Sequence, residues 1–270
     1  MARLWTEVAD GVLVRRYHFL EQNIVAVVGR GEALVVDTRS TYRQARQILD
    51  DLREIGAPRI AAVVNTHGHY DHAFGNRLFR PAPIWGHERA AVMLAPGGGQ
   101  RELAAQDLPR LAGELAEVEL DPPDRVFAAD AVVEVGGRRV RLAFLGRGHT
   151  DNDIVVLVDG ADAIVAGDLL ENGAAPYFGD GYPLEWPSTA GAIVALATER
   201  TVVIPGHGAL GDRHFAAAQA ADIAEVAALA RRVHAGDLDL EAAVAASPFE
   251  PGQSREPLER ALAQLRGELD

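Results

Sequence analysis

Residues 67–72 (HGHYDH) place three histidines and one aspartate within six positions. Neutral imidazole and carboxylate groups are the ligands that suit zinc, iron or manganese. The segment follows residues 60–64, a short apolar run typical of a strand covered on both faces, so its side chains start from a rigid base. We expect Gly68 to let the backbone turn sharply, so that His67 and His69 point into one space. The pattern predicts a metal site rather than a solvated histidine-rich loop without a metal.

Three further ligand-type residues stand in similar contexts along the chain: His149, Asp168 and His207. Each follows an apolar segment and lies beside glycine, as expected where a strand gives way to a loop. Together with the segment 67–72, these residues mark four strand ends that carry ligand-type side chains, and such a repetition is difficult to obtain by chance. The pattern therefore predicts one site assembled from segments far apart in the sequence.

The chain of 270 residues contains no cysteine, and all 26 of its Lys+Arg residues are arginine. A cysteine nucleophile, a disulfide, a thiolate-bound zinc and an iron–sulfur cluster are therefore excluded. The absence of lysine excludes an internal Schiff base, lysine-linked pyridoxal phosphate and a Walker A phosphate loop. Polar catalysis is left to hydroxyl groups, carboxylates, arginine and nine histidines.

The formal net charge is −13, and the sequence shows no cluster of basic residues. An acidic surface repels phosphate backbones, so we predict no nucleic-acid partner. No apolar run approaches the ~20 residues that span a bilayer, and the first residues lack the features of a secretory signal. These patterns predict a cytoplasmic protein with no membrane partner.

Two blocks of strands, each followed by a helix, must position the metal candidates. In the first block we expect strands at 12–17, 24–28 and 33–36, a helix at 41–55 and a strand at 60–64. In the second block we expect strands within 125–167, a helix at 188–198, a strand at 202–204, and helices from Asp212 onward. This order predicts two sheets packed face to face with helices outside. We expect residues 1–210 to form one domain and residues 211–270 to be a helical extension packed on it.

The spaced set of ligand candidates resembles that of the metallo-β-lactamase superfamily over residues 10–210. Asp37, at the end of an apolar run, matches the first short motif of that family, in which an aspartate has a structural or supporting role. The resemblance implies an α/β fold, a four-layer αββα sandwich with the metal site along one edge of the paired sheets. It also implies two groups of metal ligands with Asp168 bridging both metals. The first group is His67, His69 and His149, and the second is Asp71, His72 and His207.

The resemblance further implies a reaction. Two metal ions ~3.5–4 Å apart would hold a hydroxide as the nucleophile, so that no serine or cysteine is required. We expect two zinc ions, with iron or manganese as alternatives, and we place Asp71 in the catalytic group as well as among the ligands. The predicted activity is hydrolysis of an ester, thioester, lactone or amide bond in a small-molecule substrate.

Asp168 distinguishes the branches of the superfamily. Members that resemble glyoxalase II, lactonases, phosphodiesterases and tRNA-processing nucleases have an aspartate here, whereas true metallo-β-lactamases have cysteine or serine. The acidic charge disfavours the nuclease branch, and His69 disfavours flavodiiron proteins, which carry glutamate at that position. Hydrolysis of β-lactam antibiotics and a persulfide dioxygenase with a single iron are the alternative activities. A metal-stabilised binding protein without catalysis is the alternative of a different class.

The segment after Asp168 concentrates four aromatic residues: Tyr177, Phe178, Tyr182 and Trp186. They could form an aromatic wall over the metals, or pack on the core instead. Tyr177 and Tyr182 are candidate catalytic residues that would donate a hydrogen bond to the oxyanion. Residues 92–117 could form a second wall or a lid.

Several polar residues near the ligand candidates have less specific contexts. Arg147 is a candidate for binding a substrate carboxylate, or else a solvated arginine, and Thr150 and Asp151 are candidates for orienting ligands. We interpret Asn152 as a turn residue and His87 as a hydrogen-bonded structural histidine. The remaining histidines lack a metal-binding context: His18, His214 and His234.

Overall fold

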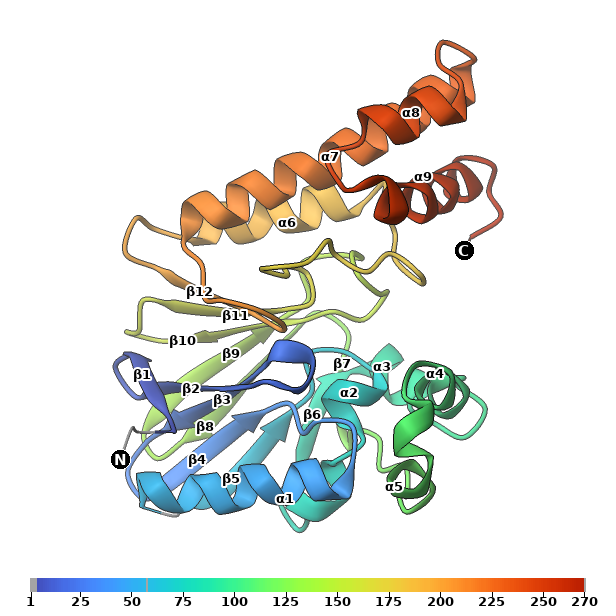
Figure 1. Ribbon diagram of the computed structural model, residues 1–270. Helices are drawn as coiled ribbons and strands as arrows, with labels where there is room; N and C mark the ends of the chain where they lie inside the picture. Colours follow the sequence, from blue (N-terminus) through green and yellow to red (C-terminus); the bar gives the residue numbers. More distant parts are fainter. Residues whose placement is uncertain (1–3, 57, 270) are drawn as a thin grey trace.

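Two β-sheets face each other across an apolar core in the computed structural model, which describes residues 4–56 and 58–269 (Figure 1). Within these residues the first sheet has seven strands in chain order: β1 (Thr6–Ala9), β2 (Val12–Tyr17), β3 (Gln22–Val28), β4 (Glu32–Val36), β5 (Arg59–Val64), β6 (Ile84–His87) and β7 (Arg125–Phe127). The second has five: β12 (Val202–Pro205), β11 (Ala163–Gly167), β10 (Val155–Val158), β9 (Arg138–Ala143) and β8 (Asp130–Val135). Strands β4 to β7 run parallel to one another, as do β11 and β12.

The strands are apolar on both faces because each sheet is covered on both sides. In β3, Val25 and Val27 face the core between the sheets, whereas Ile24 and Ala26 face outward. Successive side chains of a strand point to opposite faces, so this alternation requires a second apolar layer outside the sheet.

Helices supply those outer layers. Helix α1 (Tyr42–Asp51) packs Ala45 and Ile48 on the outer face of the first sheet. Helices α6 (Trp186–Leu196) and α7 (Arg213–Ala235) cover the outer face of the second sheet. The layers are therefore helix, sheet, sheet and helix, which confirms the predicted αββα sandwich.

Local signals account for the ends of α1. Thr41 accepts a hydrogen bond from the Gln44 backbone N–H at 3.3 Å, as an N-cap does. After the 3-10 turn Leu52–Ile55, Gly56 adopts a left-handed conformation (φ 90°) that ends the helix. The predicted helix at 41–55 is confirmed, and the helix predicted at 188–198 begins two residues earlier, at Trp186.

Shorter helices lie beside the edge of the first sheet: α2 (Tyr70–Ala73), α3 (Glu88–Met93), α4 (Gln100–Asp107) and α5 (Ala112–Ala116). Three further 3-10 turns connect elements: Phe19–Glu21, Asn76–Phe79 and Pro109–Leu111. Helix α4 packs through Ala104 against Tyr70 and Phe74. It therefore stands next to the histidine-rich segment.

The C-terminal helices α8 (Leu240–Ala246) and α9 (Pro251–Leu265) pack on the second half of α7 and project beyond the sandwich (Figure 1). Helix α9 also reaches the loop after β11, because Arg260 Nε donates to the Gly181 carbonyl at 2.8 Å. The division of the chain after residue 210 stays a prediction. None of the helices in the described part of the chain is both long and apolar enough to cross a membrane.

Candidate metal centre

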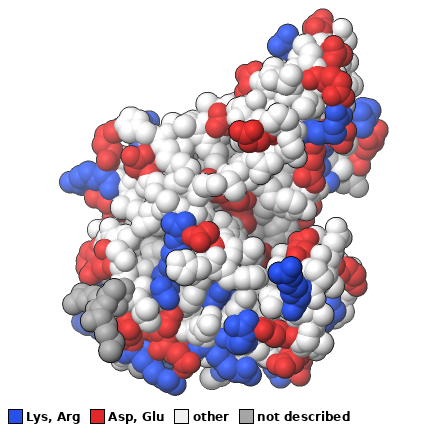
Figure 2. Space-filling view, viewed as in Figure 1, with Lys and Arg blue, Asp and Glu red and all other residues white. Residues whose placement is uncertain are grey.

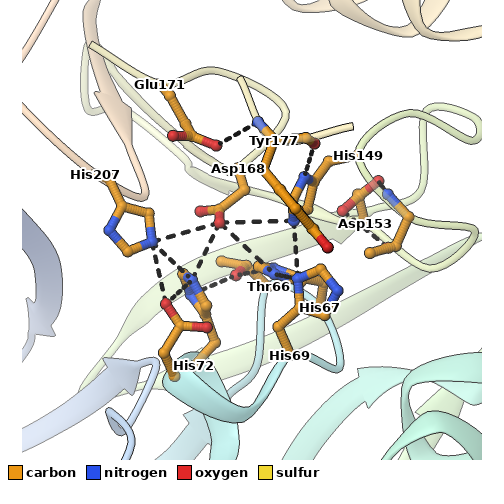
Figure 3. A network of polar contacts seen from close by, with 12 residues as sticks. Thr66, His67, His69, His72, His149, Asp153, Asp168, Glu171, Tyr177 and His207 are labelled. Atoms are coloured by element: carbon orange, nitrogen blue, oxygen red, sulfur yellow. Dashed lines mark hydrogen bonds and ion pairs between the residues drawn. The ribbon is translucent and has the colours of Figure 1, made fainter. Parts of the chain in front are cut away.

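All seven predicted ligands meet at one edge of the paired sheets. The segment with His67, His69, Asp71 and His72 leaves β5 of the first sheet, and His149 lies in the connection between β9 and β10 of the second. Asp168 and His207 follow the parallel strands β11 and β12. Figure 3 shows the labelled side chains of this set pointing toward one another, with Asp168 in their midst: His67, His69, His72, His149, Asp168 and His207.

The first group of nitrogens is compact and buried. His69 Nδ1 lies 3.0 Å from His67 Nε2 and 2.9 Å from His149 Nε2. No side chain of the three is more than 6% exposed. The three ligand atoms lie within 4.8 Å of one another, a spacing that a single metal ion can bridge.

The second group lies beside the first. Asp71 Oδ2 is 3.4 Å from His72 Nε2 and 3.3 Å from His207 Nε2, and the two imidazole nitrogens are 3.2 Å apart. These atoms also lie within 4.8 Å of one another.

A single oxygen of Asp168 lies between the groups. Its Oδ2 is 3.8 Å from His67 Nε2 and 3.7 Å from His149 Nε2 in the first group. The same atom is 3.3 Å from His72 Nε2 and 3.4 Å from His207 Nε2 in the second group. This position suits a carboxylate that joins two cations, and the bridging role stays a prediction.

Each histidine has a partner for the ring nitrogen that faces away from the centre. His72 Nδ1 donates to Asp37 Oδ2 at 2.8 Å, and His69 Nε2 faces Asp180 Oδ2 at 3.0 Å. Backbone carbonyls accept hydrogen bonds from two other histidine rings. The Tyr177 carbonyl accepts from His149 Nδ1 at 3.0 Å, and the Leu20 carbonyl accepts from His207 Nδ1 at 2.7 Å.

Thr66 completes this outer set. Its hydroxyl donates a hydrogen bond to Asp37 Oδ2 at 2.9 Å. The hydroxyl oxygen of Thr66 can therefore accept a hydrogen bond from His67 Nδ1 at 3.1 Å. When the outer nitrogen of a neutral imidazole carries the proton, the inner nitrogen presents a lone pair.

The residues therefore fit a pair of metal ions. Inner nitrogens at 2.9–3.2 Å from one another would direct lone pairs at each other unless a cation lay between them. Asp168 Oδ1 is in addition a buried oxygen without a hydrogen-bond partner among the described residues.

Burial and the site charges shift the ionisation of these ligands in two directions. Burial lowers the pKa of His149 to about 4, and it lowers the pKa of His67 well below its usual value. Burial also opposes charge on His72 and His207, but Asp168 and Asp71 outweigh it and raise the pKa of both imidazoles. Burial would raise the pKa of Asp168, yet His72 and other histidines hold it well below its usual range. In the first group, burial therefore disfavours the charged form of His67 and His149, whereas Asp180 raises the pKa of His69 against the effect of burial, and the carboxylate between the groups is favoured in its ionised form.

Two backbone features near the ligands correct or extend the sequence interpretation. Gly68 does not adopt a left-handed conformation; a Cβ there would lie 2.9 Å from Met93 Sδ, so the position needs space rather than a sharp turn. Asp37 has φ 66°, a conformation that is unusual outside glycine and that concentrates at functional sites. The strained backbone lets its carboxylate accept from both Thr66 and His72.

Polar residues around the His149 loop have specific roles. Asn152, interpreted as a turn residue, is fully buried, and its Oδ1 accepts from the Gly68 backbone N–H at 2.8 Å. Asn152 does lie in a bend, and its amide in addition joins the loops that carry His69 and His149. Thr150 donates through N–H and hydroxyl to the buried Asp153, which the sequence analysis did not single out. Burial raises the pKa of Asp153 to about 7.

A cavity of about 410 Å³ opens over the ligands. Of the four predicted aromatic residues, only Tyr177 is among the described residues that line it. Phe178 and Trp186 are fully buried in the core of the second sheet, which contradicts an aromatic wall over the metals. The ring of Tyr182 lies under the Arg147 guanidinium, 4.2 Å from it, and outside the cavity lining. The structure therefore gives no support to a catalytic role for Tyr182.

Arg147 and His87 have structural partners. Arg147 donates two hydrogen bonds to the Glu185 carboxylate, at 2.8 and 2.5 Å, so its charge is already matched within the chain. The His87 ring packs 4.5 Å from that of Phe144, and its Nε2 donates to the Ala128 carbonyl at 3.1 Å. Helix α4 does contribute a wall, because Leu103 and Asp107 line the cavity.

The αββα sandwich and the clusters of histidine and aspartate at its edge define a class of metal-binding protein, and comparison with known proteins identifies the family. The profile of the Metallo-beta-lactamase superfamily matches residues 19–224. The chain belongs to this superfamily and carries the site of a metal-dependent hydrolase.

Individual relatives are distant. The chain is 28% identical over 268 residues to a hydroxyacylglutathione hydrolase of Gloeobacter violaceus, covering 95% of each protein. It is 23% identical over 184 residues to a metallo-beta-lactamase type 2 of Bacillus cereus; the match covers 67% of this chain and 64% of that enzyme, less than two thirds of its length. The structure of a metallo-beta-lactamase from Pontibacter korlensis superposes on this chain with a TM-score of 0.64 at 21% sequence identity. The superposition covers 82% of this chain and 98% of that protein, so the two share a fold.

Proposed function

We propose that the protein is a dinuclear zinc hydrolase that cleaves an ester, thioester, lactone or amide bond of a small molecule. The observation that carries the proposal is the position of Asp168 Oδ2, within 3.8 Å of ligand nitrogens from both histidine groups. A carboxylate so placed belongs to a site for two cations rather than one.

Two divalent cations in such a site lower the pKa of a bound water toward neutrality and polarise the substrate oxygen. The side chains of the protein orient the ligands and set the spacing of the two groups. Asp37 and Asp180 hold the imidazoles of His72 and His69 in one orientation and one tautomer. Asp168 fixes the distance between the two ligand groups, and no serine or cysteine is needed as nucleophile.

Tyr177 is the side chain best placed to assist the reaction. It lines the cavity, with its ring 6.3 Å from that of His69 and 6.0 Å from that of His149. Burial, together with the nearby carboxylate of Asp180, raises the pKa of the phenol. The hydroxyl therefore stays protonated near neutral pH and could donate a hydrogen bond to the developing oxyanion.

Metal analysis of protein reconstituted with zinc tests the proposal. We expect two zinc ions per chain and turnover of at least one chromogenic ester, thioester or lactone. His69→Ala removes a nitrogen from the first group and should lower turnover by at least about 100-fold. His234→Ala, an exposed histidine on α7, is the matched control and should behave as the unaltered protein. A protein that takes up no metal, or a His69→Ala variant with full activity, would contradict the proposal.

Two further assays, on the protein as purified, test the alternative activities. Hydrolysis of a cephalosporin would place the protein with the metallo-beta-lactamases that it resembles in sequence. A single iron per chain with oxygen consumption on glutathione persulfide would indicate a dioxygenase. Each of the two ligand groups contains three ligand-type side chains, which favours the dinuclear hydrolase over an enzyme with a single metal ion.

The setting of the site also supports a small-molecule substrate rather than nucleic acid. The net charge is −13, and acidic side chains lie inside the hollow at the middle of the face in Figure 2. A phosphate backbone would be repelled from this hollow. A cytoplasmic location remains part of the proposal.

A further inference from the structure

The walls of the cavity beside the metal ligands are apolar and partly exposed. Four apolar or aromatic residues line it, of which Leu20 is 38% exposed and Tyr177 is 43% exposed: Leu20, Leu103, Tyr70 and Tyr177. Large apolar side chains gathered at the mouth of a cavity mark a surface that a ligand covers.

Leu20 is held at this position by the metal centre itself. Its backbone is left-handed (φ 59°), which is strained for a residue with a Cβ. Its carbonyl accepts the 2.7 Å hydrogen bond from His207 Nδ1. The bond that orients a ligand therefore also fixes an apolar side chain beside the reacting centre.

The ionisable side chains around this apolar wall are mostly acidic. Glu21, Asp107 and Glu171 line the cavity in addition to the ligand carboxylates. They come from three elements: the turn after β2, helix α4 and the loop after β11. Asp107 lies within hydrogen-bond distance of the Tyr70 hydroxyl, at 3.1 Å, so it faces the apolar wall.

Positive charge is scarce at the same place. Among the described residues that line the cavity, Arg16 is the single arginine, and the chain has no lysine. The Arg16 guanidinium lies 2.5 Å from Glu21 Oε2, so these two charges match each other, and the acidic groups that remain in the wall beside the ligands are Asp107 and Glu171. An anionic group on a substrate would meet carboxylates and find no unmatched arginine in the cavity wall.

We propose, on the basis of the proposed hydrolase function, that the substrate presents an apolar acyl group without a negative charge to Leu20, Leu103 and Tyr177. Neutral or cationic esters and lactones belong to this class. Esters and thioesters whose acyl group ends in a carboxylate lie outside it.

Binding of three hydroxamates to zinc-loaded protein tests the inference separately from turnover. Hexanohydroxamate, the monohydroxamate of adipate and ω-aminohexanohydroxamate share one metal-binding head and differ only in the charge of the tail. We expect calorimetry at low ionic strength to give a Kd for the anionic compound that is at least about tenfold higher than for the other two. The difference should narrow as salt is added. The p-nitrophenyl esters of the same three acids should give the same order in kcat/KM.

Two substitutions connect this order to the named residues. Asp107→Asn should improve the affinity for the anionic compound relative to the neutral one about threefold, whereas Asp237→Asn, an exposed aspartate far from the cavity, should leave the ratio unchanged. Leu20→Ala should reduce the preference for hexanohydroxamate over acetohydroxamate about fivefold. Leu20→Met should restore it, and Leu196→Ala on the surface of α6 is the control for a lost exposed leucine.

The outcomes separate the two proposals. Equal or tighter binding of the anionic compound overturns the inference whether or not any ester is hydrolysed. The expected order of Kd without turnover of any ester would support the inference and contradict the hydrolase function.

Discussion

At the scale of single residues, the groups behind the ligands matter as much as the ligands. Asp180 lies 3.0 Å from His69 Nε2, on the side of the ring opposite the metal centre. The interaction with His69 lowers the pKa of this carboxyl to about 2 against the opposing effect of burial. An ionised carboxylate behind a ligating imidazole fixes its tautomer and increases its basicity.

Asp180→Asn should therefore weaken zinc binding by about 10- to 100-fold, because the amide orients the ring less firmly and lacks the charge. Competition with a chromogenic chelator measures the affinity. Asp162→Asn changes an exposed aspartate that pairs with Arg200, and it should have no effect. Unchanged zinc affinity in Asp180→Asn would show that this carboxylate does not support the site.

Gly206 allows the approach of the carboxylate between the two groups. A Cβ at this position would lie 1.8 Å from Asp168 Oδ1, so the carboxylate would have to move. We expect Gly206→Ala to lower zinc affinity and turnover by about 10- to 100-fold and to cost about 1–3 kcal/mol of stability from overpacking.

Gly191 on α6 provides the matched comparison, because a Cβ there meets nothing within 4 Å. Gly191→Ala should be neutral or slightly stabilising in thermal unfolding. Full zinc content and full turnover in Gly206→Ala would contradict the role given to Asp168.

At the scale of elements, the ligands are placed by strand ends that the sequence marks clearly. Apolar runs that stop at ligand-type residues predicted β5, β11 and β12 and the candidates that follow them. Helix α1 was predictable because Thr41 and Gly56 are ordinary start and stop signals. These features are local, so one sequence suffices to find them.

The features that were missed depend on contacts between distant segments. Asp180 is 111 positions from His69, and Asn152 is 84 positions from Gly68. Neither has a local pattern that distinguishes it from an ordinary loop residue. The aromatic residues Phe178 and Trp186 were ambiguous for the same reason, since only the packing of the second sheet shows that they belong to its core.

At the scale of the whole molecule, the metal centre joins the two halves of the sandwich. His67, His69, Asp71 and His72 extend from the first sheet, and His149, Asp168 and His207 extend from the second. Both predicted ligand groups contain residues from both sheets. Metal bound to either group would therefore hold the sheets together at the edge where the cavity opens.

Removal of metal should accordingly destabilise the entire fold. A ligand that binds only the folded state stabilises it by about 2.7 kcal/mol at 100 times its Kd, so zinc at that concentration should raise Tm by roughly 5–10 °C for a chain of this size. Calorimetry before and after treatment with a chelator measures the difference. Returned zinc should restore Tm, whereas magnesium, which prefers oxygen ligands, should not. The chelator should affect His69→Ala less than the unaltered protein, because one ligand group is already incomplete. An identical Tm with and without the chelator would show that the sheets are held together by their apolar core alone.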